Sequence, residues 1–262
     1  MKRVLVAIML GMSLALPVYA DVTLKQTTVG KGMGMSGNAS GATYIKGNRM
    51  RSDMVLGDKT QTTIFDVDAQ KMYIFDSKKK EADVWDMAAF SAELSKTVDM
   101  SSAKASLQPN GKTKQVAGQS ATGYDVDISM QSAMGGSKDM TMTVTLSGPM
   151  AIVKNAPGSR DYARFYKAAV EKGWIFSDPR GAKAQPGQAK AMAEMYRQMA
   201  EIGGIPYEMD VQIKMSGSGP MAGLLAKMGN VTMTTTVDSV DVAPLADDLF
   251  APPAGYKLNQ KK

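Results

Sequence analysis

Methionine is the residue type whose chemistry stands out in this sequence, with 23 copies among 262 residues. Thioether sulfurs are soft ligands for Cu(I), and Met33 and Met35 flank Gly34 in a glycine-rich stretch that could form an open copper site. Most other methionines occupy apolar positions of predicted strands and helices, where an unbranched, polarisable side chain packs adaptably. We therefore expect the methionines to line a core or a cavity, and copper binding is the alternative.

Patterns for covalent or acid–base catalysis are incomplete. Ser77 to Lys80 and Ser101 to Lys104 match S-x-x-K, in which a lysine activates a serine, but the sequence holds no S-D-N or K-T-G partner motif. Asp125 and Asp127 share the polar face of one predicted strand, whereas a catalytic carboxylate pair converges across a cleft. Histidine and cysteine are both absent, which excludes imidazole catalysis, Cys/His zinc sites and disulfides. We predict that the protein is not an enzyme and holds no cofactor and no resident metal.

The composition is that of a folded chain with a sizeable core: 44% of the residues are hydrophobic, 21% charged and 6% aromatic. The formal net charge is +6, and the basic residues are dispersed except in the run Lys78-Lys79-Lys80. Nucleic-acid binding uses a basic patch interleaved with aromatic residues, so we expect no nucleic-acid partner. The lysine run is typical of a solvated hairpin tip, and attraction to an anionic membrane surface is its alternative interpretation.

The first 20 residues have the pattern of a secretory signal peptide. Lys2 and Arg3 form a positive start, and Val4 to Leu16 is an apolar run shorter than a membrane span. Val18-Tyr19-Ala20 then places small residues at the cleavage positions. We expect cleavage after this segment, export to the periplasm, and a single domain over residues 21–262.

After this leader, apolar side chains mostly recur at every second position, and turn residues interrupt them at short intervals. This pattern predicts antiparallel strands with one buried face. The clearest examples are Tyr124 to Met130 and Met140 to Leu146, with a glycine- and serine-rich loop predicted at Ser132 to Lys138. Two long closing strands are predicted at Ile205 to Met215 and Asn230 to Val242. The chain is therefore expected to be mainly β.

Three helices are predicted where the apolar spacing lengthens to three and four residues. They span Met87 to Val98, Ser159 to Lys172 and Ala189 to Ile202. Ser159 is the expected N-cap of the second helix, and Gly173 follows its expected end. The apolar stripe of the third helix consists of Met192, Met195, Met199 and Ile202.

Several segments carry a resemblance to a known superfamily. Tyr44 to Asp53 (YIKGNRMRSD), Thr63 to Asp66 (TIFD) and Lys71 to Asp76 (KMYIFD) are similar to the meander of the periplasmic lipoprotein carriers of the LolA, LolB and LppX type. Gly203 to Pro206 and Leu249 to Tyr256 (LFAPPAGY) resemble a related family of exported bacterial proteins of unassigned function, which ends in F-x-x-P-x-G-Y.

The resemblance implies a mainly β fold with α-helices: an antiparallel, incompletely closed β-barrel, or half-barrel, whose concave face is covered by helices. In the carriers this architecture encloses an apolar cavity that receives acyl chains. The sequence has no lipobox cysteine, so the resemblance does not extend to an anchored receptor of the LolB type.

Sequence and resemblance together predict an exported, non-enzymatic binding protein that holds a lipid or another amphiphile in a methionine-rich cavity. Strand alternation turns five methionines inward as candidate ligand-binding residues: Met130, Met140, Met142, Met209 and Met215. Plain core packing explains the same positions equally well. The alternatives are a Cu(I)-buffering protein that uses Met33 and Met35, and an envelope scaffold that binds another protein along an exposed sheet edge.

Overall fold

A computed structural model describes residues 21–32, 35–97, 103–134, 137–174, 176, 178–182, 186–218, 222–223, 225 and 230–261. The predicted signal peptide, Met33 and Ser101 lie outside these residues. Among the described residues, no helix is both long enough and apolar enough to cross a membrane.

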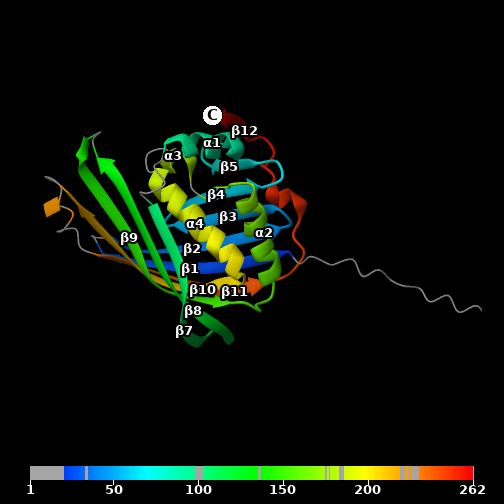
Figure 1. The fold of residues 1–262 in the computed structure, drawn as a ribbon. Helices are drawn as coiled ribbons and strands as arrows, with labels where there is room; N and C mark the ends of the chain where they lie inside the picture. The colour runs from blue at the N-terminus through cyan, green and yellow to red at the C-terminus, as the bar shows by residue number, and fades with distance from the viewer. Residues whose placement is uncertain are drawn as a thin grey trace, which may run out of the picture.

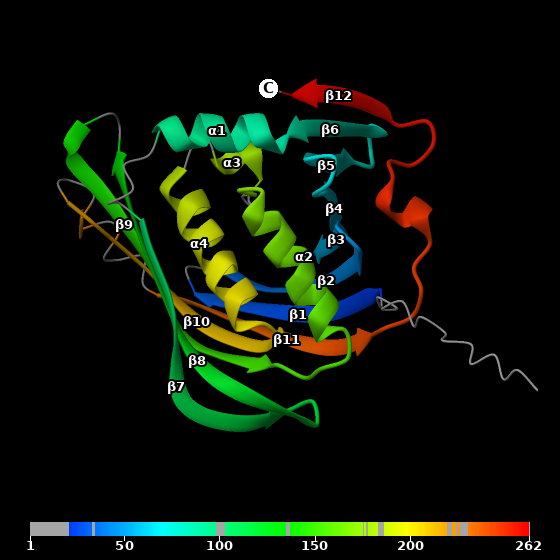
Figure 2. The same cartoon turned by 45° about the vertical axis from the view of Figure 1, so that its right-hand side comes forward.

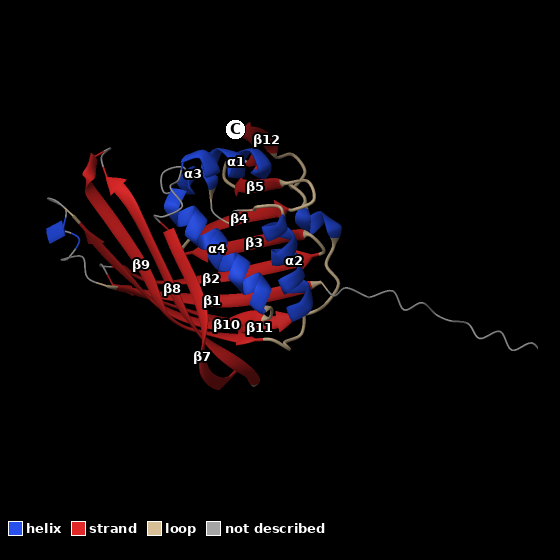
Figure 3. Cartoon of the chain, viewed as in Figure 1, coloured by secondary structure: helices blue, strands red, loops and turns tan. Residues whose placement is uncertain are grey.

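The strands form one strongly curved, twelve-stranded sheet in the order β12-β6-β5-β4-β3-β2-β1-β11-β10-β9-β8-β7 (Figures 1 and 3). Neighbouring strands are antiparallel except β12, which pairs with β6 in parallel. Because β12 and β7 stand at opposite edges, the sheet is not closed into a barrel. The strands are β1 Val22–Gly32, β2 Met35–Lys46, β3 Arg49–Leu56, β4 Lys59–Asp66, β5 Lys71–Asp76, β6 Glu81–Asp86, β7 Ala103–Val116, β8 Gln119–Met134, β9 Ser137–Val153, β10 Ile205–Gly217, β11 Val231–Asp241 and β12 Lys257–Lys261.

Helices lie inside the curve of this sheet. They are α1 Met87–Thr97, α2 Ser159–Glu171, α3 Pro179–Ala182 and α4 Pro186–Ile202. The short 3-10 helix η3 Asp247–Phe250 lies against the other face of β3, where Arg49 contacts Asp247 and Phe250. Figure 2 shows α2 and α4 side by side across the concave face. The prediction of a mainly β, incompletely closed antiparallel barrel with helices over its concave face is therefore confirmed.

Side-chain alternation explains why these segments form strands. In β8, Tyr124, Val126 and Ile128 are buried, whereas Asp125 and Asp127 between them are exposed. Successive side chains of a strand point to opposite faces, so β8 has one face on the core and the other in water. The two aspartates stand on the wet face, apart from the core.

Two clusters of buried side chains hold the helices on the sheet. The larger one joins Phe165 and Ala169 of α2 to Val22 and Ile45 on the strands. The smaller one packs Met195 of α4 against apolar side chains of β7, β8 and β9. The amphipathic helices thus bury their apolar faces against the concave side of the sheet, and this packing fixes the distance between the two layers.

The predicted helix over residues 159–172 is confirmed as α2, but its predicted N-cap is wrong. Gly158 occupies the N-cap with a φ of 72°, and no side chain caps the helix. A Cβ atom at this position would lie 2.7 Å from Cγ2 of Val22. The left-handed backbone and the close approach to β1 both require glycine, so Ser159 becomes the first residue of the helix.

The loop predicted at Ser132 to Lys138 is wrong in extent. β8 continues to Met134 and β9 begins at Ser137, and these two residues face each other across the hairpin. The register shifts between Ala133 and Met134, so the two strands extend into the predicted loop through an irregular pairing.

Candidate ligand cavity

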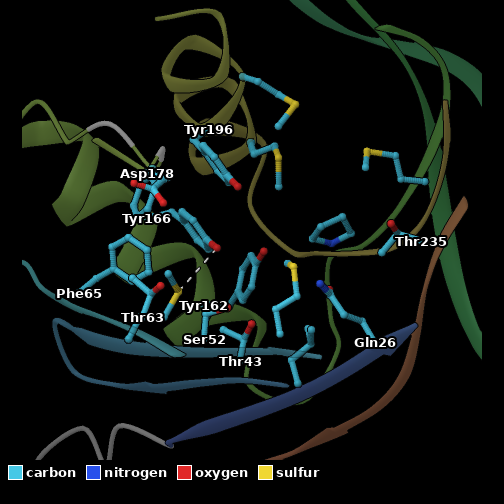
Figure 4. A pocket seen from close by; sticks show the side chains of 18 of the residues that line it. Gln26, Thr43, Ser52, Thr63, Phe65, Tyr162, Tyr166, Asp178, Tyr196 and Thr235 are labelled. Carbon is cyan, nitrogen blue, oxygen red and sulfur yellow. Dashed lines mark hydrogen bonds between the residues drawn. The ribbon is translucent and has the colours of Figure 1, made fainter. Parts of the chain in front are cut away.

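A cavity of about 420 Å³ lies between the helices and the concave face of the sheet. Its lining comes from both layers: from the strands β1 to β4 and β9 to β11, and from α2 and α4 (Figure 4). The twenty lining residues are Leu24, Gln26, Thr43, Met50, Ser52, Met54, Gln61, Thr63, Phe65, Met150, Tyr162, Tyr166, Phe176, Asp178, Met195, Tyr196, Met199, Pro206, Met209 and Thr235. The volume is within the range of about 300–1,000 Å³ that is typical of small-molecule sites.

Methionine is the commonest residue type in this lining. The six methionines are Met50, Met54, Met150, Met195, Met199 and Met209. They come from β3, β9, α4 and β10, so flexible thioether side chains face the cavity from both layers. Unbranched side chains with three rotatable bonds adapt to apolar ligands of different shapes.

Aromatic rings form the helix side of the cavity. Tyr166 of α2 stacks on Tyr196 of α4 with 5.2 Å between the ring centroids and 4° between the planes. Phe176 lies 5.1 Å from the ring of Tyr166 and 4.8 Å from that of Tyr196. The Tyr162 ring is 4.8 Å from that of Tyr166. These contacts join α2 and α4 into one wall.

The tyrosine hydroxyls of this wall stay protonated. The Tyr166 hydroxyl donates a hydrogen bond to Sδ of Met50 at 3.8 Å, drawn as a dashed line in Figure 4. Burial raises the pKa of Tyr162, Tyr166 and Tyr196 above the ordinary value. The phenolate is the form that burial disfavours, so these groups are neutral hydrogen-bonding groups at the cavity surface.

The sheet side of the cavity carries a row of polar side chains among its apolar ones. Thr43, Ser52 and Thr63 stand directly opposite one another on β2, β3 and β4 and form one row across three strands. Gln26 lies beside this row on β1. On β11, the hydroxyl of Thr235 is hydrogen-bonded to the hydroxyl of Thr28, with 2.9 Å between the two oxygens. Figure 4 shows these side chains on the sheet side and the tyrosines on the helix side of the same space.

The cavity is deep at one end and open at the other. Leu24 and Met50 at the deep end are each only 4% exposed. Met54, near the end of β3, is 50% exposed, and Gln61 on the neighbouring strand is exposed as well. The exposed fractions therefore place the opening at the β3–β4 hairpin.

Asp178 is the charged residue of the lining, and its charge is compensated. The Arg180 Nε donates to both carboxylate oxygens of Asp178, at 2.9 and 3.0 Å. Partial burial alone would raise the pKa of Asp178, but the hydrogen bonds from Arg180 outweigh it and hold that pKa below its ordinary value. The cavity therefore presents no uncompensated charge from its lining residues.

The five methionines predicted from strand alternation lie in different places. Met209 lines the cavity. Met130 of β8 is buried in the smaller core cluster. It pairs with Val144 of β9, and Val144 pairs with Met215 of β10 on the other side. Met142 and Met215 are half-buried, and Met140 is in β9, with its side chain outside the described residues.

Five cavity methionines were not among the predicted site residues: Met50, Met54, Met150, Met195 and Met199. The sequence did place Met195 and Met199 on one apolar helix stripe, which is the signal that could have found them. Met50 and Met54 join the site because β1 pairs with β11 and brings the N-terminal strands beside the C-terminal ones. No local pattern reports that pairing.

The described residues contain no group of three or more Asp or Glu side chains placed to hold a metal ion. The copper alternative depends on Met33, which lies outside them, and on Met35, whose side chain does too.

Comparison with known proteins finds solved structures of low sequence identity. No model of a known protein family matches the sequence, and no curated protein matches it. An uncharacterised conserved protein from Thermus thermophilus is 8% identical, with 93% of this chain and 92% of that chain covered and a TM-score of 0.39. A LolA superfamily protein from Nitrosomonas europaea is 7% identical over 89% of this chain and 91% of its own, with a TM-score of 0.29.

A DUF1329 family protein from Desulfovibrio piger is 8% identical, over 89% of this chain and 90% of that chain, with a TM-score of 0.23. The matched structures include a member of the LolA superfamily, to which the meander motifs were compared.

Proposed function

We propose that this protein is an exported, non-enzymatic binding protein that holds a lipid or another amphiphile in the cavity between its helices and its sheet. The observation that carries the proposal is the cavity itself: about 420 Å³ of space with six methionines and three tyrosines among its lining residues. Apolar side chains and neutral polar groups around one space suit a ligand with an apolar tail and a polar head.

Burial of the tail supplies the binding energy. At about 25 cal/mol per Å², covering roughly 200 Å² of alkyl surface is worth about 5 kcal/mol before the cost of immobilising the ligand. A preformed cavity reduces that cost because its walls are already held in place by the packing of α2 and α4.

The remaining predicted methionines extend the same face beyond the cavity. Strand register continues the inner face of β10 from Met209 through Val211 and Ile213 to Met215, beside Met142 on β9. Val211 is buried, and Ile213, Met215 and Met142 beyond it are half-buried. A tail longer than the cavity would reach this half-buried part of the face. Met142 and Met215 would then contact the tail, while Met209 contacts the part next to the head.

The compartment follows from the leader-like first segment of the sequence, and we propose the periplasm. A protein that carries amphiphiles there needs no cofactor, and its partners are the ligand and the membrane from which the ligand comes. An anionic membrane surface would attract Lys78, Lys79 and Lys80, which are exposed in the β5–β6 hairpin.

Displacement of a hydrophobic dye tests the proposal. The fluorescence of N-phenyl-1-naphthylamine should rise on mixing with the protein and fall on titration with a lysophospholipid. Met199→Asp and Met209→Asp place a carboxylate at half-buried positions of the lining and should abolish the rise. Leu258→Asp, on an exposed position of β12, is the matched control and should leave it unchanged. Dye binding that survives both cavity variants in folded protein contradicts the proposal.

A further inference from the structure

The cavity lining combines apolar side chains with many neutral polar groups. Nine of its twenty lining residues carry neutral hydrogen-bonding groups, ten are apolar, and one is Asp178. The polar groups other than the tyrosines lie on strands of the sheet, and the tyrosine rings of α2 and α4 lie opposite (Figure 4). The lining methionines Met195 and Met199 also belong to α4. A cavity built for a bare alkyl chain would be apolar on all sides, because covering an unpaired polar group with hydrocarbon is unfavourable.

The polar groups on the sheet wall are available to a ligand. Within the part of the chain that the structure describes, no hydrogen bond joins the side chains of Gln26, Thr43, Ser52 or Thr63 to another protein group. All four are half-buried and face the cavity. A ligand that covered one of them without replacing its hydrogen bonds to water would lose about 5- to 150-fold in affinity for each group.

Their arrangement suits a headgroup with several oxygens. Thr43, Ser52 and Thr63 form a straight row because each stands opposite the next on neighbouring strands. Adjacent strands lie about 4.8 Å apart, so the row offers a hydroxyl at regular short intervals. Each hydroxyl both donates and accepts, and the Gln26 amide next to the row does the same. Vicinal hydroxyls on a sugar or polyol are spaced to meet groups of this kind.

The charge balance excludes an ionic headgroup at this place. Asp178 is already held by Arg180. The other lining residues are uncharged: a tyrosine is neutral at neutral pH, and burial raises the pKa of these three further. An anionic or cationic headgroup placed between these walls would be a buried charge without a partner, which is strongly unfavourable.

From the unpartnered polar row and the compensated charge, we infer that the ligand is a neutral, hydroxyl-rich amphiphile, such as a glycosyl or polyol lipid. Its headgroup lies on Gln26, Thr43, Ser52 and Thr63, and its tail lies against the methionines of α4 and β10. This inference rests on the proposed function and specifies the class of ligand.

Three compounds with the same octyl tail test the inference by competition with N-phenyl-1-naphthylamine: octyl β-glucoside, nonanoate and octyltrimethylammonium. We expect the glucoside to have a Kd at least about tenfold lower than either ion, since only its headgroup pairs with the row. Equal affinities for the three compounds, or tighter binding of either ion, would overturn the inference while leaving the proposed function standing. Absence of dye binding and of binding by all three compounds would overturn the proposed function and the inference with it.

Isosteric variants then locate the headgroup. The double variant Thr43→Val/Thr63→Val removes two hydroxyls at constant shape and should raise the Kd of the glucoside at least about 25-fold, which is about 5-fold or more for each hydroxyl. Thr236→Val is the matched control, because its position on β11 points to the face opposite that of Thr235. Ser52→Ala is a second, smaller perturbation that should act in the same direction. An unchanged Kd for the glucoside in folded double variant and in Ser52→Ala overturns the placement of the headgroup.

Discussion

The ring of Phe165 decides whether the helix wall of the cavity is held in place. Phe165 lies on α2, is fully buried, and belongs to the larger core cluster. Its ring centroid is 5.4 Å from that of Tyr166 in an edge-to-face arrangement and 6.0 Å from that of Phe176. Both neighbours line the cavity. Phe165→Ala therefore removes support from the wall without touching a ligand.

The expected loss of stability is large. Truncation of a buried phenylalanine costs about 3–5 kcal/mol, of which two aromatic pairs supply about 1–3 kcal/mol. Urea unfolding followed by circular dichroism should show a lower midpoint with an unchanged slope. The cavity should also bind N-phenyl-1-naphthylamine more weakly, because Tyr166 and Phe176 lose the ring that positions them.

Phe75→Ala is the control for this prediction. Phe75 is half-buried on β5 and has one aromatic neighbour, Tyr256, at 5.7 Å. Its truncation should cost less than that of Phe165 and leave dye binding unchanged. A loss of unfolding free energy below about 1 kcal/mol for Phe165→Ala would refute the packing of α2 on the sheet, because truncating a buried aromatic ring in a well-packed core costs several times that amount.

Three further predictions concern other parts of the fold. Gly158→Ala should cost more stability than Gly47→Ala in thermal unfolding, because both glycines have positive φ but only the Cβ at 158 would meet neighbouring atoms; equal losses would contradict the close approach to β1. Arg180→Gln should lower stability by under about 1 kcal/mol at neutral pH. Because the folded-state pKa of Asp178 is depressed, its contribution is present above the ordinary aspartate pKa and lost as the pH falls through the folded value, so the gap between variant and wild-type Tm should close in acid. Gln198→Ala should accelerate amide exchange in β7, to whose edge this side chain is hydrogen-bonded at 2.8 and 2.9 Å; unchanged exchange would show that the edge does not depend on it.

Local patterns in the sequence were sufficient for the longer strands and for the three longer helices of the fold. Alternation of buried and exposed residues in β8 and the helical stripe of Met195 and Met199 follow directly from the periods of strand and helix. The N-cap of α2 could not be predicted in the same way. Ser159 has the favoured residue type, but the choice of Gly158 depends on the distance to Val22, which is a tertiary contact.

The site was harder to predict than the fold. Met209 was found because it lies on a strand with clear alternation, whereas Met50 and Met54 are on β3, where serine separates them on the same face. A strand face that alternates apolar and polar side chains predicts partial exposure to solvent rather than a cavity wall. Only the pairing of β1 with β11 shows that this face meets Met209 across one cavity.

Native mass spectrometry of the protein purified from its own cells without detergent tests the central claim most directly. The account predicts a stoichiometric adduct with the mass of an amphiphile, which Met209→Asp should lack and Leu258→Asp should keep. Fragmentation of the adduct should release a neutral, hydroxyl-rich headgroup. A folded protein that carries no adduct, and takes none up from a lipid extract of the same cells, would contradict the claim.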